Sequence, residues 1–274
     1  MMMIKKNLFF SLSIFSFSLI FISCEKVIDI DLNDSEPLYV IESDLNDGDS
    51  LHTVRISNSS KFSSNNIFPE VNGAIVTLFD DNGISEVLTE VSSGLYKSSM
   101  YKIKGIQGHS YTLKVEIGGE VFIASSKMPN KVNLDKISFI KNNFSGEGAK
   151  TPVPIRQDPA DEQNNYLFDM YRKDFKNEIG WVRDSAILIT DDFYANGVTT
   201  QQPLFGKIRV FLPNDSIRIV QKCINREIYK YFFSLSQNGP NGSATPANPI
   251  SNFSGGCLGY FSAQTKQVVE AIVE

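Results

Sequence analysis

Apolar and polar residues alternate along much of the chain, and this two-residue period predicts β-strands. Turn pairs such as Asn82-Gly83 and Gly118-Gly119 separate the alternating segments at intervals of about ten residues, a spacing typical of antiparallel sandwiches. We therefore expect an immunoglobulin-like or transthyretin-like antiparallel sandwich over residues 37–130. Its predicted strands are 38–41, 51–56, 74–79, 84–91, 111–117 and 121–124.

Residues 131–274 are predicted to form a second, β-rich domain. Their segment 141–165 is rich in proline and glycine and is longer than most connections, so it is either a loop excursion or contains a short strand. The whole chain is thus expected to be mostly β. The strands predicted in this domain are 132–140, 166–171, 185–190, 207–212 and 216–220.

One helix is predicted, at about residues 225–237. Asn225 is a favourable N-cap, and Gly239-Pro240 ends the segment. Between them the apolar residues have the spacing i, i+3, i+4 and i+7, which places them on one face for packing on the second sheet. These residues are Ile228, Tyr231, Phe232 and Leu235.

The N-terminus carries the pattern of a secretory signal. Two lysines precede an uncharged apolar run over residues 8–22, and Ser23-Cys24 follows. This pattern resembles a relaxed bacterial lipobox, so we predict a lipoprotein signal peptide over 1–23 and lipidation of Cys24. An uncleaved membrane helix is the alternative, but it needs about 20 apolar residues, and four serines interrupt this run.

The lipidated N-terminal segment, residues 24–36, is expected to contain the first strand, at 28–32. Glu25, Asp29 and Asp31 lie in this segment and resemble the acidic surface-export signals of Bacteroidota lipoproteins. The alternative is that these acids are the polar positions of an alternating edge strand.

Composition excludes several classes of protein. Hydrophobic residues make up 42% of the chain and charged residues 21%, which argues against pervasive disorder and against a multi-span membrane protein. The formal net charge of -5 and the pI near 5.2 argue against nucleic-acid binding. With two histidines and three cysteines, a zinc site with several such ligands is not expected.

The search for catalytic motifs favours a protein that is not an enzyme. Neither G-x-S-x-G nor H-E-x-x-H is present, and structural or solvated roles are expected for His52 and His109. The segment 146–151 resembles a phosphate loop but has Ala149 where a glycine is needed before the lysine. No cofactor and no metal site are predicted.

Two acidic segments have alternative interpretations. Residues 44–49 offer the clustered oxygen ligands that calcium prefers. Their spacing differs from that of a calcium-binding loop, so an acidic hairpin tip is favoured. Asp191-Asp192 would serve glycoside hydrolysis only with a second carboxylate held about 5 to 9.5 Å away across a cleft.

Once Cys24 is assigned to lipid, Cys223 and Cys257 remain as an even pair in an oxidising compartment. A disulfide between them would close a loop that contains the helix and would contribute roughly 3 to 4 kcal/mol. Two separate buried thiols are the alternative, and both interpretations stay open at this point.

Several segments resemble the domain of unknown function 4249 family. They are Cys24-Glu25, 28–30, 38–42, 71–76, 94–96, 108–113, 248–252 and 255–263. The resemblance implies an outer-membrane lipoprotein of Bacteroidota, often encoded beside a TonB-dependent receptor, and it transfers no catalytic residue. Asp-Ser-apolar triplets at Ser50, Ser185 and Ser216 also resemble the O-glycosylation sites of that phylum.

These observations predict a non-enzymatic outer-membrane lipoprotein, lipid-anchored and exposed at the cell surface. We expect it to act as an accessory of a TonB-dependent receptor in nutrient capture or uptake. A stand-alone surface adhesin for glycans or host protein is the alternative, and an envelope hydrolase that uses acidic residues is a third candidate.

Overall fold

A computed structural model describes residues 37–48, 51–60, 68–99, 102–176, 180–208, 210–238 and 248–274. The signal peptide, Cys24, the strand expected at 28–32 and Ser50 lie outside these residues. Among the described residues, none of the helices has the length and apolar character to cross a membrane.

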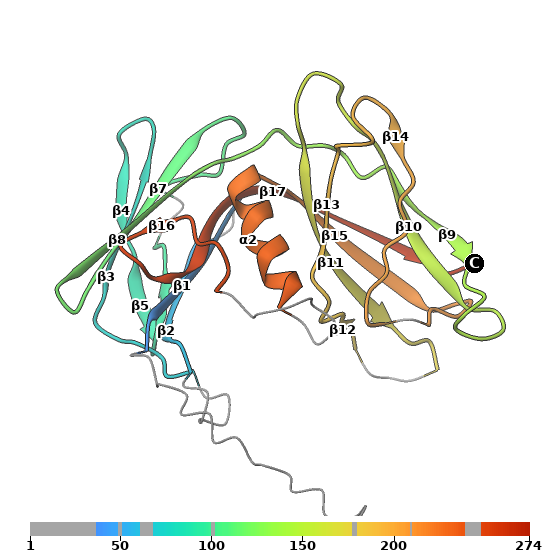
Figure 1. Cartoon of the computed structure of the whole chain (residues 1–274), viewed down its shortest axis with the longest axis horizontal. Helices are drawn as coiled ribbons and strands as arrows, with labels where there is room; N and C mark the ends of the chain where they lie inside the picture. Colours follow the sequence, from blue (N-terminus) through green and yellow to red (C-terminus); the bar gives the residue numbers. More distant parts are fainter. Residues whose placement is uncertain are drawn as a thin grey trace, which may run out of the picture. The chain divides into compact units, whose positions relative to one another are not determined.

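The first sandwich pairs a five-stranded sheet, in the order β16-β8-β7-β3-β4, with one half of a nine-stranded sheet (Figure 1). Its strands are β1 (Tyr39–Asn46), β2 (Thr53–Asn58), β3 (Ile75–Asp80), β4 (Ser85–Val87), β5 (Thr89–Ser92), β6 (Leu95–Lys97), β7 (Ser110–Ile117), β8 (Glu120–Lys127) and β16 (Phe253–Ser254). Five of the six strands predicted within residues 37–130 appear among these elements. The single strand predicted at 84–91 is wrong, because the segment divides into β4, which pairs with β3, and β5, which pairs with β6 in the other sheet.

Alternation explains the core of the first sandwich. Ile41 and Ile56 from the nine-stranded sheet meet Val76 and Leu113 from the five-stranded sheet, and all four are buried in one cluster. The predicted hairpin of β7 and β8 is confirmed, and both glycines of its turn have positive φ, which non-glycine residues rarely adopt.

The second sandwich packs a three-stranded sheet, in the order β14-β10-β9, on the other half of the nine-stranded sheet (Figure 1). Its strands are β9 (Lys136–Lys141), β10 (Lys150–Gln157), β11 (Asn165–Lys173), β12 (Val182–Arg183), β13 (Leu188–Asp191), β14 (Thr199–Thr200) and β15 (Ser216–Ile224).

Three sequence predictions are resolved in this region. The segment 141–165 contains β10, so the alternative with a hidden strand is confirmed. The strand predicted at 207–212 is wrong, because the described residues there form only an isolated bridge from Phe211 to Lys150. Val132, predicted to begin a strand, instead enters the core before β9 starts at Lys136.

The longest strand, β17 (Leu258–Ile272), belongs to both sandwiches. It pairs in parallel with β1 and antiparallel with β15, and this parallel pair is an addition to the expected antiparallel arrangement. Phe261 on its first half is buried in the first core, whereas Val269 packs against the second. The described residues from 37 onward therefore cluster as one compact unit, and a domain boundary at residue 130 stays a prediction.

The predicted helix is confirmed as α2 (Arg226–Gln237), the one helix of the described residues. The Oδ1 atom of Asn225 accepts a hydrogen bond of 3.0 Å from the backbone N–H of Ile228, which caps the first turn. Tyr231 packs on Tyr260 of β17 with ring centroids 5.0 Å apart, so the helix covers part of the outer face of the nine-stranded sheet (Figure 1). The mostly-β fold with a single helix is thus confirmed.

Candidate functional site: two cavities at Leu204 and Phe205

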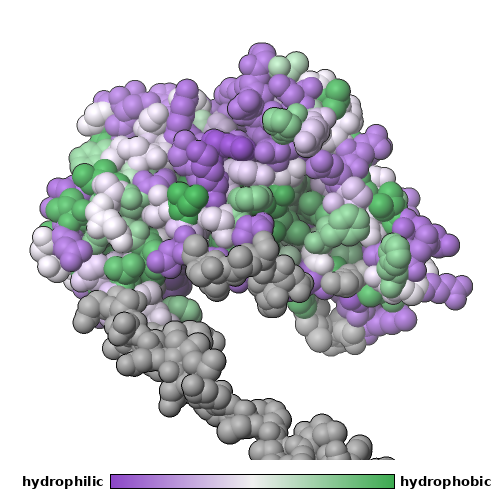
Figure 2. All heavy atoms as spheres, viewed as in Figure 1, coloured by the Kyte–Doolittle hydropathy of each residue, from purple (hydrophilic) through white to green (hydrophobic). Residues whose placement is uncertain are grey.

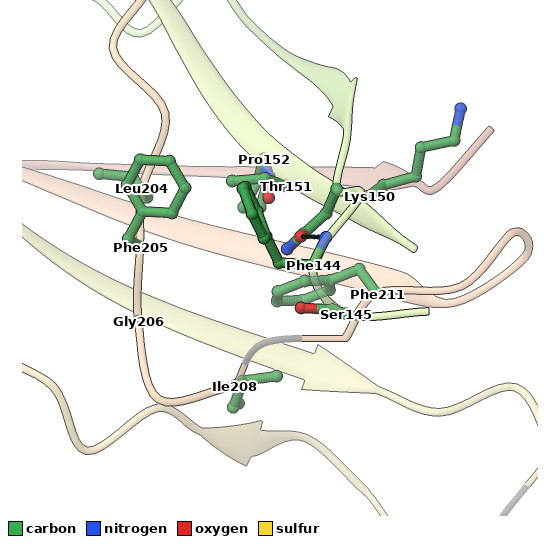
Figure 3. Close-up of a pocket in the computed structure, with 11 residues that line it drawn as sticks. Phe144, Ser145, Lys150, Thr151, Pro152, Leu204, Phe205, Gly206, Ile208 and Phe211 are labelled. Carbon is green, nitrogen blue, oxygen red and sulfur yellow. Dashed lines mark hydrogen bonds between the residues drawn. The ribbon is translucent and has the colours of Figure 1, made fainter. Parts of the chain in front are cut away.

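The first cavity, of about 320 Å³, opens between β10, the β9–β10 loop and the segment before β15. We call it the aromatic cavity. Figure 3 shows Phe205 entering from one side and Phe144, from the β9–β10 loop, facing it, while the side chain of Lys150 points away. Its lining residues are Asn142, Phe144, Ser145, Lys150, Thr151, Pro152, Leu204, Phe205, Gly206, Ile208 and Phe211.

Two large rings at this cavity are exposed to solvent. Phe144 is 102% exposed and Phe205 72% exposed. Fully burying such a side chain contributes about 1.5 to 3 kcal/mol, so a partner that covers both gains a substantial part of its binding free energy from them. Figure 2 shows other apolar side chains reaching the surface over the second sandwich. Grouped exposed apolar residues of this kind mark interaction surfaces.

The second cavity, of about 260 Å³, shares Leu204 and Phe205 with the first. We call it the Arg156 cavity. Its walls come from β10, β11, β13 and the segment 202–205; most of the lining residues are apolar, but polar atoms make up the larger part of the exposed lining. The lining residues are Pro154, Arg156, Phe168, Ile187, Leu188, Ile189, Thr190, Gln202, Pro203, Leu204 and Phe205.

Arg156 is the unusual residue of this cavity, because it is a cation that is only 1% exposed. Its Cζ atom lies 3.9 Å from the ring centroid of Tyr166 and 5.6 Å from that of Phe168. Its Nε and Nη2 atoms have no hydrogen-bond partner. These two nitrogens occupy the same edge of the guanidinium plane, the edge that binds a carboxylate through two parallel hydrogen bonds.

The energetics of Arg156 are unfavourable without a further partner. Removing a cation from water costs several kcal/mol even after the protein relaxes. A desolvated cation–π contact returns about 2 kcal/mol. The stacking on Tyr166 therefore offsets part of the cost and leaves the hydrogen-bonding edge of Arg156 unsatisfied.

Asp158 lies near Arg156 but has a different partner. One of its oxygens, Oδ1, accepts a hydrogen bond from the hydroxyl of Tyr166, and Oδ2 has no hydrogen-bond partner. Burial raises the pKa of Asp158 above its usual value, while the Tyr166 bond and the charge of Arg156 act in the opposite direction. Burial also raises the pKa of Tyr166, with Asp158 adding to the shift, so the hydroxyl keeps its proton and remains the donor.

The acidic pair examined for hydrolysis has structural contacts instead. Asp191 Oδ2 forms an ion pair of 3.0 Å with Arg226 Nη1. Asp192 Oδ2 accepts a hydrogen bond of 2.7 Å from the backbone N–H of Asn164. These bonds fix the loop beside β13 to β11 and α2.

Both histidines also lie outside the two cavities. His52 is buried, and its Nε2 atom is 2.6 Å from the carbonyl oxygen of Ile103. His109 Nδ1 is 2.7 Å from Asp81 Oδ1 in a turn. The expected structural roles of the histidines agree with these contacts. Among the residues that the structure describes, no group of three or more His, Cys, Asp or Glu is placed to hold a metal ion.

The cysteine prediction requires a correction. Cys223 and Cys257 are both free and buried, so the structure contains no bridge between them. Cys223 belongs to the core of the second sandwich and Cys257 to the core of the first. The alternative with two separate buried thiols is therefore the arrangement observed.

The two described serines of the glycosylation triplets have different environments. Ser185 is exposed, whereas Ser216 is half-buried at the start of β15 and pairs with strands on both sides. The preceding Asp184 and Asp215 are buried and accept backbone hydrogen bonds. Glycosylation stays a prediction, with Ser185 the more accessible of the two positions.

A family model described as a domain of unknown function, DUF4249, matches residues 25–269. The chain belongs to this family. The match covers both sandwiches and confirms the resemblance seen in the sequence. No curated protein matches the chain.

Sequence reasoning missed Arg156, although it lies within the DUF4249 match. On β10, residues 152, 154 and 156 lie on one face, and all three are buried. An arginine on the same strand face as two buried prolines would have indicated a buried cation. This inference was possible only if the segment had first been assigned as a strand. Phe144 and Phe205 lie in loops, where no periodic pattern identifies them.

Proposed function

We propose that this protein is a non-catalytic lipoprotein, tethered to the outer membrane through Cys24, that acts as an accessory of a TonB-dependent receptor. It helps the receptor to capture or admit a nutrient. The observation that carries the proposal is the pair of adjoining cavities at Leu204 and Phe205, with exposed aromatic rings at their mouth.

The two cavities suit this role in different ways. The exposed rings of Phe144 and Phe205 provide apolar area that a protein partner buries. The Arg156 cavity, which is open to solvent, provides space for a small ligand beside that contact surface. In this proposal, the receptor-binding surface and the ligand site therefore lie side by side on the second sandwich.

The lipid accounts for the location. Each buried methylene contributes about 0.8 kcal/mol, so two or three acyl chains hold a water-soluble body at a bilayer. A formal net charge of -5 gives the chain no general attraction to anionic lipid surfaces. In this proposal the anchor supplies proximity to the receptor, and the described body supplies the contacts.

Co-purification from native membranes in mild detergent tests the proposal. We expect a TonB-dependent receptor to accompany the wild-type protein, and the double variant Phe144→Ser/Phe205→Ser to recover at least tenfold less of it. The matched control, Val87→Ser/Val121→Ser, removes exposed apolar residues from the first sandwich and should leave the recovery unchanged.

Three results would reject the proposal. The first is the absence of any receptor from the purified wild-type protein. The second is a Cys24→Ala protein that remains bound to the membrane. The third is tight binding of a polysaccharide by protein without receptor, since that result would establish the adhesin alternative.

A further inference from the structure

We propose that an extended segment of a protein partner, with acidic ends and apolar residues at alternate positions, adds as a strand to the free edge of β9. This edge borders a groove of about 690 Å³, which we call the β9 groove. Residues 136–139 of β9 form one wall, and Ala271 and Ile272 at the end of β17 form another (Figure 1). The inference rests on the proposed function for the identity of the partner, which is the receptor.

The β9 groove lies between two strands that each lack a neighbour on this side. β9 is the last strand of the three-stranded sheet, in the order β14-β10-β9. β1 pairs with residues 258–264 of β17, whereas residues 265–272 pair only with β15 among the described strands. A free strand edge presents backbone N–H and C=O groups at the spacing of another extended chain, so a polypeptide is the ligand that matches it.

The register of β9 with β10 identifies the outward backbone groups. The N–H of Asn142 donates a hydrogen bond of 2.8 Å to the carbonyl oxygen of Ala149, so this is a hydrogen-bonded pair. Hydrogen-bonded and non-hydrogen-bonded pairs alternate along antiparallel strands. The even-numbered residues of β9 therefore bond to β10, and Phe139 and Lys141 direct their N–H and C=O groups to the free edge. Neither of these two residues is buried.

The prolines of β10 support the same assignment. Pro152 and Pro154 lie opposite Phe139 and Ile137. Because a proline has no N–H to donate, it is tolerated where the ladder needs no donor. The carbonyl oxygen of Pro152 accepts a hydrogen bond of 2.9 Å from the N–H of Leu204, on the side of β10 away from β9. The odd-numbered residues of β9 and their partners on β10 therefore direct their backbone groups away from each other.

Lysines select an acidic strand over a second copy of this chain. Lys136 and Lys141 stand at the two ends of β9, and Lys150 lies opposite Lys141. Antiparallel pairing of β9 with its own copy would place Lys136 opposite Lys141, and like charges in that position are destabilising. Within the described residues, Lys136 and Lys150 form no ion pair, and Glu274 is the one acid that lines the groove. Acidic ends on the added strand would pair with these lysines.

The inner wall selects the apolar positions of the added strand. Ile137 belongs to the core of the second sandwich, and Phe139 and Ala271 pack against that core. Side chains directly opposite on paired strands lie on the same face of the sheet. Residues of the partner opposite Ile137 and Phe139 therefore point inward and are apolar, while those between them face solvent.

The β9 groove also adjoins the surface proposed to contact the receptor. Lys150 lines both the β9 groove and the aromatic cavity, and Figure 3 shows its side chain pointing away from the latter. Phe144 follows β9 in the loop to β10. A receptor segment paired with β9 would therefore continue into contact with Phe144.

Fluorescence anisotropy tests the inference with a labelled peptide, Glu-Val-Thr-Val-Thr-Val-Thr-Glu, and the full chain in phospholipid nanodiscs; empty nanodiscs are the blank. We expect saturable binding by the wild-type protein. In antiparallel pairing the valine amides face β9, so N-methylation of the three valines should weaken binding at least tenfold. N-methylation of the three threonines is the matched control, because their amides face away from β9, and it should leave binding unchanged.

Residue-resolved hydrogen exchange locates the bound strand. The peptide should slow exchange of the amides of Phe139 and Lys141, which have no strand partner in the described protein. The amides of Ser138 and Ile140 already pair with β10 and should exchange at the same rate with and without peptide. Apolar docking without strand addition would not produce this alternation.

Charge exchange assigns the ends of the strand. The surface double variant Lys136→Glu/Lys150→Glu should weaken binding of the peptide at least tenfold and should bind the version that carries lysine in place of both glutamates. The matched control, Lys127→Glu/Lys230→Glu, makes the same change in net charge at exposed positions outside the groove and should leave binding unchanged.

Four results would overturn the inference: no saturable binding of the peptide, equal losses on N-methylation of valines and threonines, unchanged exchange at Phe139 and Lys141, or equal binding by Lys136→Glu/Lys150→Glu. The titration contains no receptor. Failure of the peptide to bind while the receptor still co-purifies would therefore reject strand addition and leave the proposed function standing. Absence of the receptor would reject the proposed function, whereas peptide binding would still establish the strand-addition site.

Discussion

The two sandwiches share β17 but differ in what they bury. In the first, the buried acidic, basic or histidine side chains of the described residues are His52 and Glu86, and the rest of the interior is mainly aliphatic and aromatic. In the second, Arg156 is buried together with four carboxylates: Asp158, Asp184, Asp192 and Asp215.

This contrast gives the two sandwiches different roles: the first supports the fold, and the second contains the candidate site. An apolar β-sandwich is stabilised by packing alone, so the first sandwich needs few buried charges. Three of the carboxylates in the second sandwich, Asp184, Asp192 and Asp215, hold loops by accepting backbone hydrogen bonds. Arg156 holds no loop in this way. The second sandwich therefore combines loops that are held by buried carboxylates with one buried cation whose Nε and Nη2 atoms have no hydrogen-bond partner.

The largest expected effect concerns the junction that both sandwiches share. Gly259 on β17 has a φ of 99°, and a Cβ atom there would lie 2.0 Å from the carbonyl oxygen of Ile41. Gly259→Ala should lower the free energy of unfolding by more than about 3 kcal/mol, because the obstructing atom is backbone and the dihedral angle is strained. The matched control is Gly119→Ala, where φ is 83° but no atom lies within 4 Å, and it should cost about 1 kcal/mol.

Urea unfolding followed by fluorescence measures this difference. The single tryptophan, Trp181, reports on the second sandwich, whereas the contact of Gly259 with Ile41 lies in the first. If the two sandwiches unfold as one unit, Gly259→Ala shifts the fluorescence transition to lower urea. An unchanged transition would show that the sandwiches are independent despite the shared strand.

The next largest effect compares turn carboxylates in the two regions. Asp184 is 3% exposed and accepts hydrogen bonds from the backbone N–H groups of Ala186, Lys207 and Ile208. Asp184→Ala leaves these donors without partners and should cost about 3 kcal/mol or more of unfolding free energy. The control in the first sandwich is Asp80→Ala, which should cost about 1 kcal/mol, because Asp80 caps an exposed turn. Chemical denaturation measures the loss of unfolding free energy in both variants. Equal losses would contradict the expected difference between the two sandwiches.

These comparisons also show which parts of the fold the sequence predicts. The β7–β8 hairpin and α2 were predictable because their determinants are local: alternation around Gly118-Gly119, and an N-cap at Asn225 followed by apolar residues at helical spacing. Most of the first sandwich follows from the same two-residue period. Such elements need no knowledge of distant contacts.

β17 was not predictable from alternation. At its centre, residues 261–265 are buried in succession, so the strand is covered on both faces where it passes from the first core to the second. β10 was obscured by Pro152 and Pro154, which argue against a central strand. These prolines are tolerated because β14 pairs with β10 only at Arg156 and Gln157.

The candidate site was unpredictable for a different reason. Its walls combine β10, β13 and the segment 202–205, which are distant in sequence. Their convergence depends on the register of β11 with β13 and on a backbone bond from Leu204 to Pro152. Arg156 is recognisable as unusual only once these contacts show that it is buried without a hydrogen-bond partner.

A smaller effect, of opposite sign, is expected at Arg156 itself. Arg156→Met should raise the free energy of unfolding by about 1 to 3 kcal/mol, because it replaces an unsatisfied buried charge by an apolar side chain of similar length. In the first sandwich, Glu86→Gln should be near neutral or destabilising, because Glu86 Oε1 accepts two bonds from Ser99. Thermal unfolding of both variants measures the difference. Destabilisation by Arg156→Met would indicate that the arginine has a structural partner.

Opposite pH dependences should distinguish the two regions further. Backbone and side-chain hydrogen bonds from Ser110 and His109 lower the pKa of Asp81 below 3.8, so its contribution to stability is present above that pH and is lost as the pH falls through the lowered value. Burial raises the pKa of Asp158 above 3.8, so the folded state holds the proton more tightly. Stability then decreases as the pH rises from 3.8 to the raised value.

Asparagine variants isolate these two contributions. Asp81→Asn should reduce the loss of stability at acid pH, whereas Asp158→Asn should reduce the loss of stability that occurs as the pH rises. Thermal unfolding measured from about pH 3 to about pH 7 tests both signs. The two variants should change the dependence of stability on pH in opposite directions. A change in the same direction would contradict the view that hydrogen bonds stabilise the Asp81 carboxylate whereas burial destabilises that of Asp158.

The smallest expected effect is that of a reductant, which should leave the unfolding midpoint unchanged. Cys257 lies in the first core and Cys223 in the second, and both are free. Burial raises the pKa of Cys257 to about 12 and also raises that of Cys223, so neither thiol forms an appreciable amount of the reactive thiolate near neutral pH. Maleimide labelling of Cys223 and Cys257 should therefore require unfolding. Peptide mapping that found a bridge between them in the native protein would mean that the two cores do not remain separate, and the contrast between the sandwiches would need revision.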